Sequence, residues 1–138
     1  MAGYSGTPLT TKLGIRPASR VLLLNAPAGF ALAGVAPVTR AQGLADVILS
    51  FHTERGELAK RMPVLRERMR ADARLWIAWP KKASKRPTDL TEDVVRELAL
   101  ENRLVDNKVA AIDEKWSGLQ LVIRVRDRVG SEGRVSRD

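Results

Sequence analysis

The sequence contains no cysteine and only one histidine, His52, among its 138 residues. These absences exclude disulfide bonds, thiolate metal sites, cysteine nucleophiles and any metal site built from several histidines. Aromatic residues make up only 4% of the chain, so the core must be mainly aliphatic. No glycine-rich phosphate loop and no serine–histidine–acid pattern stands out in the sequence. The sequence therefore predicts no metal and no cofactor, and it favours a non-catalytic protein over an enzyme.

Long apolar runs are scarce as well. The best candidate, residues 21–36 (VLLLNAPAGFALAGVA), is interrupted by Asn25, Pro27 and Gly29. A membrane-spanning helix needs about 20 consecutive apolar residues, and a secretory signal would stand closer to the start of the chain. We therefore interpret the run as a buried strand followed by a turn. The corresponding expectation is a cytoplasmic protein that does not associate with membranes.

Positive charge is abundant, because the formal net charge is +8 and the isoelectric point is about 10.6. Such an excess favours anionic partners, including nucleic acid. Residues 80–88 form one dense basic focus with four basic residues and no acidic one, whereas residues 89–115 contain eight acidic and four basic residues. This pattern favours a small anionic ligand or an acidic protein partner. It makes nucleic acid the less favoured partner.

Apolar runs and turn signals predict alternating strands and helices. Buried strands are expected over residues 20–25, 45–52 and 74–79, and later strands over residues 106–113 and 118–126. A short first helix is expected to use Thr7 as its cap and Gly14 as its exit, and the next, over residues 53–71, to start at Thr53 and to kink or break at Pro63. The last helix has three possible caps, Thr88, Asp89 and Thr91.

This alternation predicts an α/β fold. We expect a short, mostly parallel, Rossmann-like sheet of about five strands, with helices on both faces and a C-terminal antiparallel hairpin. The domain organisation follows: residues 1–19 form an N-terminal arm with the short helix, residues 20–126 form the Rossmann-like domain, and residues 127–138 form a disordered tail. In the last strand one face is expected to carry Leu119, Leu121, Ile123 and Val125, with Gln120 on the other.

The element order over residues 20–126 resembles the later half of the class I methyltransferase fold, in which a strand ending in a Trp-Pro-Lys-like element leads to a helix and a closing hairpin. The resemblance implies that the final strand inserts beside the third. The family's glycine-rich turn after the first strand is replaced here by residues 25–29 (NAPAG). Only about 15 residues separate Gly29 from Ala45, which leaves no room for the strand whose acidic residue binds a ribose.

The chain also resembles the bacterial family catalogued as domain of unknown function 3052. This resemblance covers nearly the whole chain except the tail, and it implies a family without implying an activity. It rests on residues 1–9 (MAGYSGTPL), 12–15 (KLGI), 26–27 (AP), 29–30 (GF), 79–84 (WPKKAS), 87–92 (PTDLTE), 104–109 (LVDNKV), 111–114 (AIDE) and 116–118 (WSG).

The candidate site lies at the carboxyl edge of the predicted sheet, where open α/β sheets usually bind ligands. Four segments are expected to meet there, and they supply the candidate ligand-binding residues Asn25, Gly29, His52, Lys81, Lys82, Ser84, Lys85, Asp113 and Trp116. The lysines offer positive charge to a phosphate or a carboxylate, although they can equally pair with Asp89, Glu92 and Asp93 in a solvated loop.

These observations leave three functional hypotheses. The first is a non-catalytic module that binds a small anion or a protein partner at the edge formed by the lysines, Asp113 and Trp116. The alternative is a methyltransferase-like or other nucleotide-ligand transferase with an atypical site. The second alternative is a basic protein associated with nucleic acid.

Overall fold

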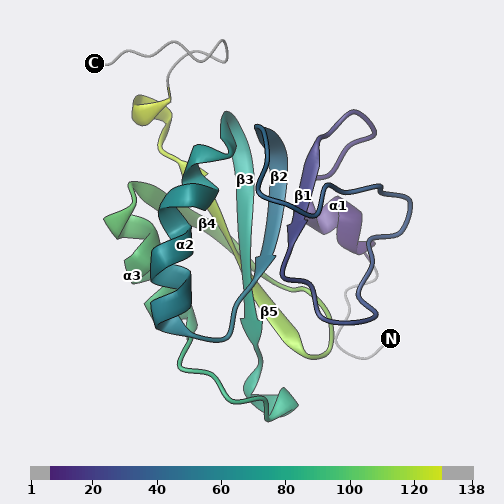
Figure 1. Cartoon of the computed structure of the whole chain (residues 1–138), viewed down its shortest axis with the longest axis vertical. Coiled ribbons are helices and arrows are strands. Elements are labelled where there is room, and N and C mark those ends of the chain that lie inside the picture. Colours follow the sequence, from purple (N-terminus) through teal and green to yellow (C-terminus); the bar gives the residue numbers. More distant parts are fainter. Residues whose placement is uncertain (1–6, 129–138) are drawn as a thin grey trace.

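The structure, a computed structural model, describes residues 7–128. Its elements follow one another as α1 (Leu9–Leu13), β1 (Val21–Leu24), β2 (Ala45–Phe51), α2 (Arg55–Glu67), β3 (Met69–Pro80), the 3-10 turn η1 (Lys82–Ser84), α3 (Glu92–Glu101), β4 (Leu104–Ala111), β5 (Trp116–Ile123) and the 3-10 turn η2 (Val125–Asp127). The predicted α/β alternation is confirmed (Figure 1). Most of the predicted tail, residues 129–138, lies outside the described residues.

The five strands form one mixed sheet in the order β1-β2-β3-β5-β4. β1, β2 and β3 are parallel neighbours, whereas β5 runs antiparallel to both β3 and β4. The final strand thus inserts beside the third, as the methyltransferase resemblance implies. The expected hairpin of β4 and β5 is present, but it does not extend the sheet in sequence order, because its second strand takes the inner position.

The two faces of the sheet are covered unequally. α2 and α3 pack side by side on one face (Figure 1), and Leu58, Met62 and Leu98 bury their side chains there against strand residues such as Ile48. The expectation of helices on both faces is only partly met. The other face has the five-residue helix α1 and an irregular segment that packs Phe30, Leu32 and Val35 against the sheet. Apolar side chains replace a regular helix there.

Helix α2 shows how packing overrides local signals. It begins at Arg55 rather than at Thr53, and its N-cap Glu54 makes no side-chain cap hydrogen bond. It continues through Pro63 as one helix instead of breaking. Proline removes one backbone hydrogen bond, but Leu58, Met62 and Leu65 are fully buried on both sides of it, and this burial holds the helix together.

Helix α1 is joined to the sheet from its C-terminal end. Thr7 does not cap it, because Pro8 occupies the N-cap position without a side-chain hydrogen bond. Gly14 ends it as expected, with a φ of 84° in the left-handed region that favours glycine. The indole N–H of Trp76, on β3, donates to the carbonyl oxygen of Leu13 over 3.1 Å.

The structure decides three expectations about helix α3 and strand β5. Helix α3 uses Thr91 as its cap, and the Thr91 hydroxyl accepts a hydrogen bond from the amide of Val94. Val125 is 76% exposed in η2, so it does not share the buried face of β5 as predicted. Gln120 was expected on a polar face but is buried, with Trp76 as its partner on the neighbouring strand, and its side-chain oxygen accepts a hydrogen bond from the side-chain amide of Asn107.

Among residues 7–128, no helix is long and apolar enough to cross a membrane. The same part of the chain brings together no group of three or more histidine, aspartate or glutamate side chains that would hold a metal ion.

Candidate functional site

A crevice lies at the carboxyl ends of β1 and β2, because the chain leaves these strands toward opposite faces of the sheet. The strands end level with each other, since Leu24 pairs with Ser50. After β1 the chain passes to the α1 face, where Phe30 packs, and after β2 it enters α2 on the other face, where Leu58 packs. Open α/β sheets bind ligands at such switch points.

The crevice holds a hollow of about 410 Å³, here named the β1–β2 hollow. It is lined by Asn25, Pro27, Phe51, His52, Thr53, Glu54, Glu57, Arg86 and Trp116. A second hollow of about 690 Å³, the outer hollow, shares Pro27, Arg86 and Trp116 with it. The outer hollow is completed by Leu9, Ala28, Gly29, Phe30, Ala31, Ile112, Asp113, Glu114 and Lys115.

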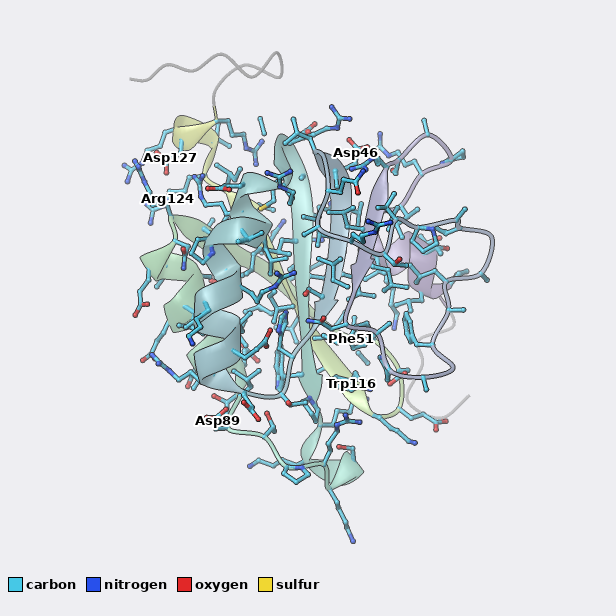
Figure 2. The ribbon with its side chains drawn as sticks, viewed as in Figure 1. Asp46, Phe51, Asp89, Trp116, Arg124 and Asp127 are labelled. Carbon is cyan, nitrogen blue, oxygen red and sulfur yellow. The ribbon has the colours of Figure 1, made fainter. Side chains whose placement is uncertain are left out.

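Aromatic side chains form the shared wall of the two hollows. The rings of Phe51 and Trp116 meet edge to face with their centroids 4.9 Å apart, and Figure 2 shows both at this edge. The Arg86 guanidinium lies over the Trp116 ring, 5.3 Å from its centroid. An arginine on an aromatic face contributes a cation–π attraction, and this attraction holds Arg86 over the Trp116 ring.

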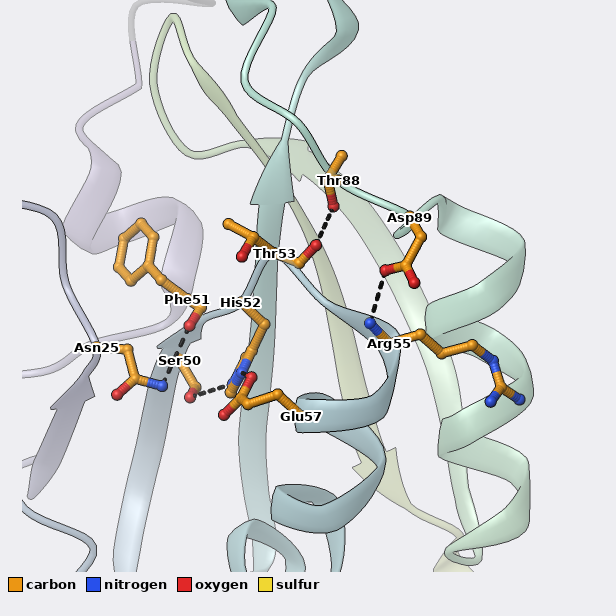
Figure 3. Close-up of polar contacts among 9 residues, drawn as sticks. All are labelled: Asn25, Ser50, Phe51, His52, Thr53, Arg55, Glu57, Thr88 and Asp89. Atoms are coloured by element: carbon orange, nitrogen blue, oxygen red, sulfur yellow. Dashed lines mark hydrogen bonds and ion pairs between the residues drawn. The ribbon is translucent and has the colours of Figure 1, made fainter.

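The loop that carries Arg86 is fastened to the segment after β2. The Thr88 hydroxyl donates to the carbonyl oxygen of Thr53 over 2.6 Å, and the Asp89 carboxylate accepts from the amide of Arg55 over 2.7 Å (Figure 3). These two hydrogen bonds join the loop after β3 to the loop after β2. They place Arg86 at the hollow although it is 34 residues beyond His52 in the sequence.

A series of hydrogen bonds leads from the buried Ser50 to His52 and Glu57, which line the β1–β2 hollow. The hydroxyl oxygen of Ser50 lies 2.6 Å from Nε2 of His52, and Nδ1 of His52 lies 2.6 Å from a carboxylate oxygen of Glu57 (Figure 3). The side chain of His52 is inaccessible to solvent, whereas that of Glu57 is 43% exposed. The sequence analysis predicted no serine–histidine–acid pattern, and this prediction was wrong.

Burial lowers the pKa of His52 below its ordinary value of about 6.5. The hydrogen bond and the negative charge of Glu57 oppose this shift, while the positive charge of Arg61 adds to it. The net effect is a lowered pKa, so the folded protein keeps the imidazole neutral at neutral pH. The single histidine therefore acts as a neutral donor and acceptor between Ser50 and Glu57.

This shift predicts a loss of stability in mild acid. Below about pH 6.5 the unfolded chain binds a proton at His52 that the folded chain does not bind, until the lower folded pKa is reached. The free energy of unfolding should therefore fall with pH in that window, by at most about 1.4 kcal/mol per pH unit from this residue. Urea unfolding at several pH values measures it, and His52→Gln, which cannot titrate, should lose this component. An equal slope in both proteins would contradict the prediction.

The structure brings together some of the predicted site residues but not others. Asn25, His52 and Trp116 line the β1–β2 hollow, while Gly29 and Asp113 line the outer hollow. The other four candidates, Lys81, Lys82, Ser84 and Lys85, line neither of these hollows. The Ser84 hydroxyl donates to the carbonyl oxygen of Lys81, which closes that turn on itself, and the loop reaches the hollow only at Arg86.

Sequence reasoning missed three side chains at this edge, Ser50, Glu54 and Glu57, and it placed Arg86 in the basic loop without choosing it as a candidate. Ser50 lies in β2 and His52 follows the strand directly, two positions further on, so the extended chain places them on one face, and Glu57 falls in the first turn of α2. That spacing was the available signal. Asp113, by contrast, has a structural part, because its carboxylate accepts from the amides of Lys115 and Trp116 and shapes the turn before β5.

Comparisons with known proteins concern the fold. No protein-family model matches the chain, and no curated protein sequence matches it. Among solved structures it is similar to LepI in a complex with SAM (TM-score 0.50, 13% identity) and to LepI with SAH and a substrate analogue (TM-score 0.52, 14% identity). Each alignment covers 84% of this chain and 39% of the LepI chain.

A further similar structure is magnesium protoporphyrin IX methyltransferase from Synechocystis PCC 6803 with bound SAM. It has a TM-score of 0.49 and 18% identity, over 66% of this chain and 48% of that one. This chain thus spans 39% of the LepI chain and 48% of the methyltransferase chain. At 13–14% identity, the similarity to the LepI structures shows a shared α/β fold alone.

These comparisons correct the first functional hypothesis. A non-catalytic module for small anions or protein partners was expected at the lysine-rich edge. The proteins that share the fold were instead solved with SAM or SAH bound, and the predicted lysines line neither hollow at this edge. The non-catalytic reading is therefore contradicted, and the transferase alternative fits better.

Proposed function

We propose that this chain is a methyltransferase-like transferase domain with an atypical site, and that it binds a nucleoside ligand of the S-adenosyl type in the β1–β2 hollow. The observation that carries the proposal is the position of that hollow. It lies where two parallel strands of a β1-β2-β3-β5-β4 sheet send the chain to opposite faces.

The side chains around the hollow fit such a ligand. A volume of about 410 Å³ is within the usual range for small-molecule sites. Glu54 and Glu57 offer carboxylate oxygens to sugar hydroxyls, and the aromatic wall of Phe51 and Trp116 offers an apolar surface to a base. Arg86 offers a guanidinium group to the carboxylate of an amino-acid moiety.

The turn after β1 makes the site atypical. Glycine-rich turns let a ligand approach the backbone closely, but here Pro27 has no backbone N–H to donate. Asn25 takes the left-handed conformation, with a φ of 58°, and its side-chain amide donates to the carbonyl oxygen of Phe51 over 3.2 Å. This bond joins the turn after β1 to the end of β2. Side chains rather than a glycine turn therefore shape the hollow.

The residues of this chain would hold the ligand and keep water from it. A sulfonium donor of this type supplies an activated methyl group when bound. Trp116 and Phe51 would exclude water on one side, while Arg86, which is exposed and lies over Trp116, would move aside or pair with the ligand carboxylate. The adjoining outer hollow provides space for a second substrate next to the same wall.

Isothermal titration with S-adenosylhomocysteine tests this proposal. We expect saturable one-to-one binding, and we expect Arg86→Ala to weaken it about tenfold, because a charge-assisted hydrogen bond contributes about 1.5–3 kcal/mol. Lys82→Ala is the matched control, since it removes a cation from the same loop but lines neither hollow. An absence of heat together with unchanged amide NMR signals for residues 24–30 and 52–57 would refute the proposal.

The proposal also includes a family for this chain. We infer membership of the family catalogued as domain of unknown function 3052 from the motifs quoted above. Two of these motifs, residues 79–84 and 87–92, flank Arg86 and include the two loop residues that fasten it, Thr88 and Asp89. The motif positions thus coincide with the loop that covers the hollow.

A further inference from the structure

The Ser50–His52–Glu57 chain has the connectivity of a hydrolytic triad but the opposite exposure. In a triad the serine hydroxyl bonds to Nε2 of histidine, the carboxylate bonds to Nδ1, and the serine faces the substrate. Here Ser50 is 0% exposed and cannot meet a substrate, whereas the Glu57 side chain is 43% exposed at the hollow. A ligand in the hollow can therefore reach the Glu57 carboxylate but not the Ser50 hydroxyl.

The hydrogen-bond donor and acceptor roles of Ser50, His52 and Glu57 follow from the chemistry of each group. An ionised carboxylate only accepts, so Nδ1 of His52 must carry the hydrogen that it donates to Glu57. A neutral imidazole then has Nε2 as an acceptor, so the Ser50 hydroxyl must donate to it. Only one tautomer satisfies both contacts, and burial, which lowers the pKa of His52, favours that neutral form.

This arrangement leaves Glu57 with one engaged and one available oxygen. Oε1 accepts from His52, while Oε2 makes no hydrogen bond or ion pair within residues 7–128. The His52 contact also orients the side chain before any ligand arrives, which reduces the entropy cost of binding. Glu54 lines the same hollow but its carboxylate has no such partner in the described chain.

We propose that Glu57 is the specificity-determining residue for the sugar of the nucleoside ligand, and that His52 and Ser50 are its positioning residues. The available carboxylate oxygen accepts a hydrogen bond from a sugar hydroxyl in the β1–β2 hollow. This inference rests on the proposed function, because it presupposes a nucleoside ligand. It adds that the group that accepts from the sugar hydroxyl belongs to helix α2, which follows β2 directly in the chain.

The test compares adenosine with 2′,3′-dideoxyadenosine on the full chain by isothermal titration, with S-adenosylhomocysteine as the reference ligand. The unsubstituted protein should prefer adenosine by about tenfold or more, because a site built to bond a hydroxyl disfavours an analogue without it. Glu57→Gln should abolish most of this preference, since its amide oxygen engages His52 and its NH2 faces the ligand. Glu67→Gln is the matched control, because it neutralises an exposed glutamate of the same helix that lines neither hollow, and it should keep the preference.

The positioning role has a separate spectroscopic readout. His52 is the only histidine, so ¹⁵N NMR of the imidazole reports its tautomer without overlap. We expect the Nδ1-protonated tautomer in the unsubstituted protein and in Glu67→Gln, and a mixture of tautomers in Ser50→Ala together with a weaker sugar preference. An Nε2-protonated ring in the unsubstituted protein would overturn the positioning role.

The outcomes separate this inference from the proposed function. Binding of S-adenosylhomocysteine without a preference for adenosine would overturn the inference and leave the proposed function standing. A full preference in Glu57→Gln, or its loss in Glu67→Gln, would do the same. An absence of binding by every nucleoside would refute both. Should Glu57→Gln fail to fold, Glu57→Asp, which keeps the charge but shortens the reach, should show the same reduced preference.

Discussion

Replacing Trp76 by alanine is expected to lower the free energy of unfolding by about 3–5 kcal/mol, the usual cost of removing a large aromatic side chain from a core. Trp76 is fully buried in β3, between Leu49 of β2 and Gln120 of β5 in the strand register. Its indole N–H also donates to the carbonyl oxygen of Leu13, which joins α1 to the sheet. The substitution therefore leaves a cavity and loosens α1.

Equilibrium urea unfolding measures this loss, and Trp76→Phe separates its two components. Phenylalanine keeps most of the ring volume but cannot donate to Leu13, so we expect it to cost about 1–2 kcal/mol. The control Leu100→Ala removes a side chain that is 51% exposed on α3 and should change stability little. A loss below about 1 kcal/mol in Trp76→Ala would show that Trp76 does not support the core as described.

Replacing Trp116 by alanine is expected to cost about 3 kcal/mol or more and to open the candidate site. Trp116 is 5% exposed, packs edge to face on Phe51 and lies beneath Arg86. It begins β5 and lines both hollows. Removing the ring merges the two hollows, releases Arg86 and takes away the apolar wall, so the affinity for S-adenosylhomocysteine should fall as well.

Trp116→Phe is the informative companion variant. It keeps an aromatic ring against Phe51 but offers a smaller face to Arg86, so most of the stability and part of the affinity should remain. Urea unfolding and titration on the same samples distinguish the two effects. Unchanged affinity in a folded Trp116→Ala protein would exclude this ring from the binding site.

Much of the fold was predictable because burial leaves a pattern in the sequence. The apolar runs predicted β1 and β2 nearly residue for residue, since a parallel strand that is covered on both faces has a continuous apolar run. The ends of α2 were less predictable. A threonine before an apolar stripe indicates a cap and a proline indicates a break, but burial of Leu58, Met62 and Leu65 outweighed both signals.

The candidate site was predictable in its place but not in its composition. The rule that ligands bind beyond the carboxyl ends of strands pointed to this edge, and the structure places Asn25, His52 and Trp116 around one hollow there. Charge density drew the prediction to the lysines of η1, which line neither hollow at this edge. Local charge along a sequence does not tell which side chain a turn directs toward a site, and Arg86 reaches it instead.

The sequence by itself determined the α/β class, the buried strands and the lack of cysteine chemistry. Each of these depends on composition or on the period of local burial. Tertiary structure alone decided the inner position of β5, the joining of Ser50, His52 and Glu57, and the placement of Arg86 over Trp116. The physical reason is that these contacts depend on the direction of side chains in three dimensions. Strand pleat, helix phase and loop tethers set those directions together, and no single segment of the sequence encodes them.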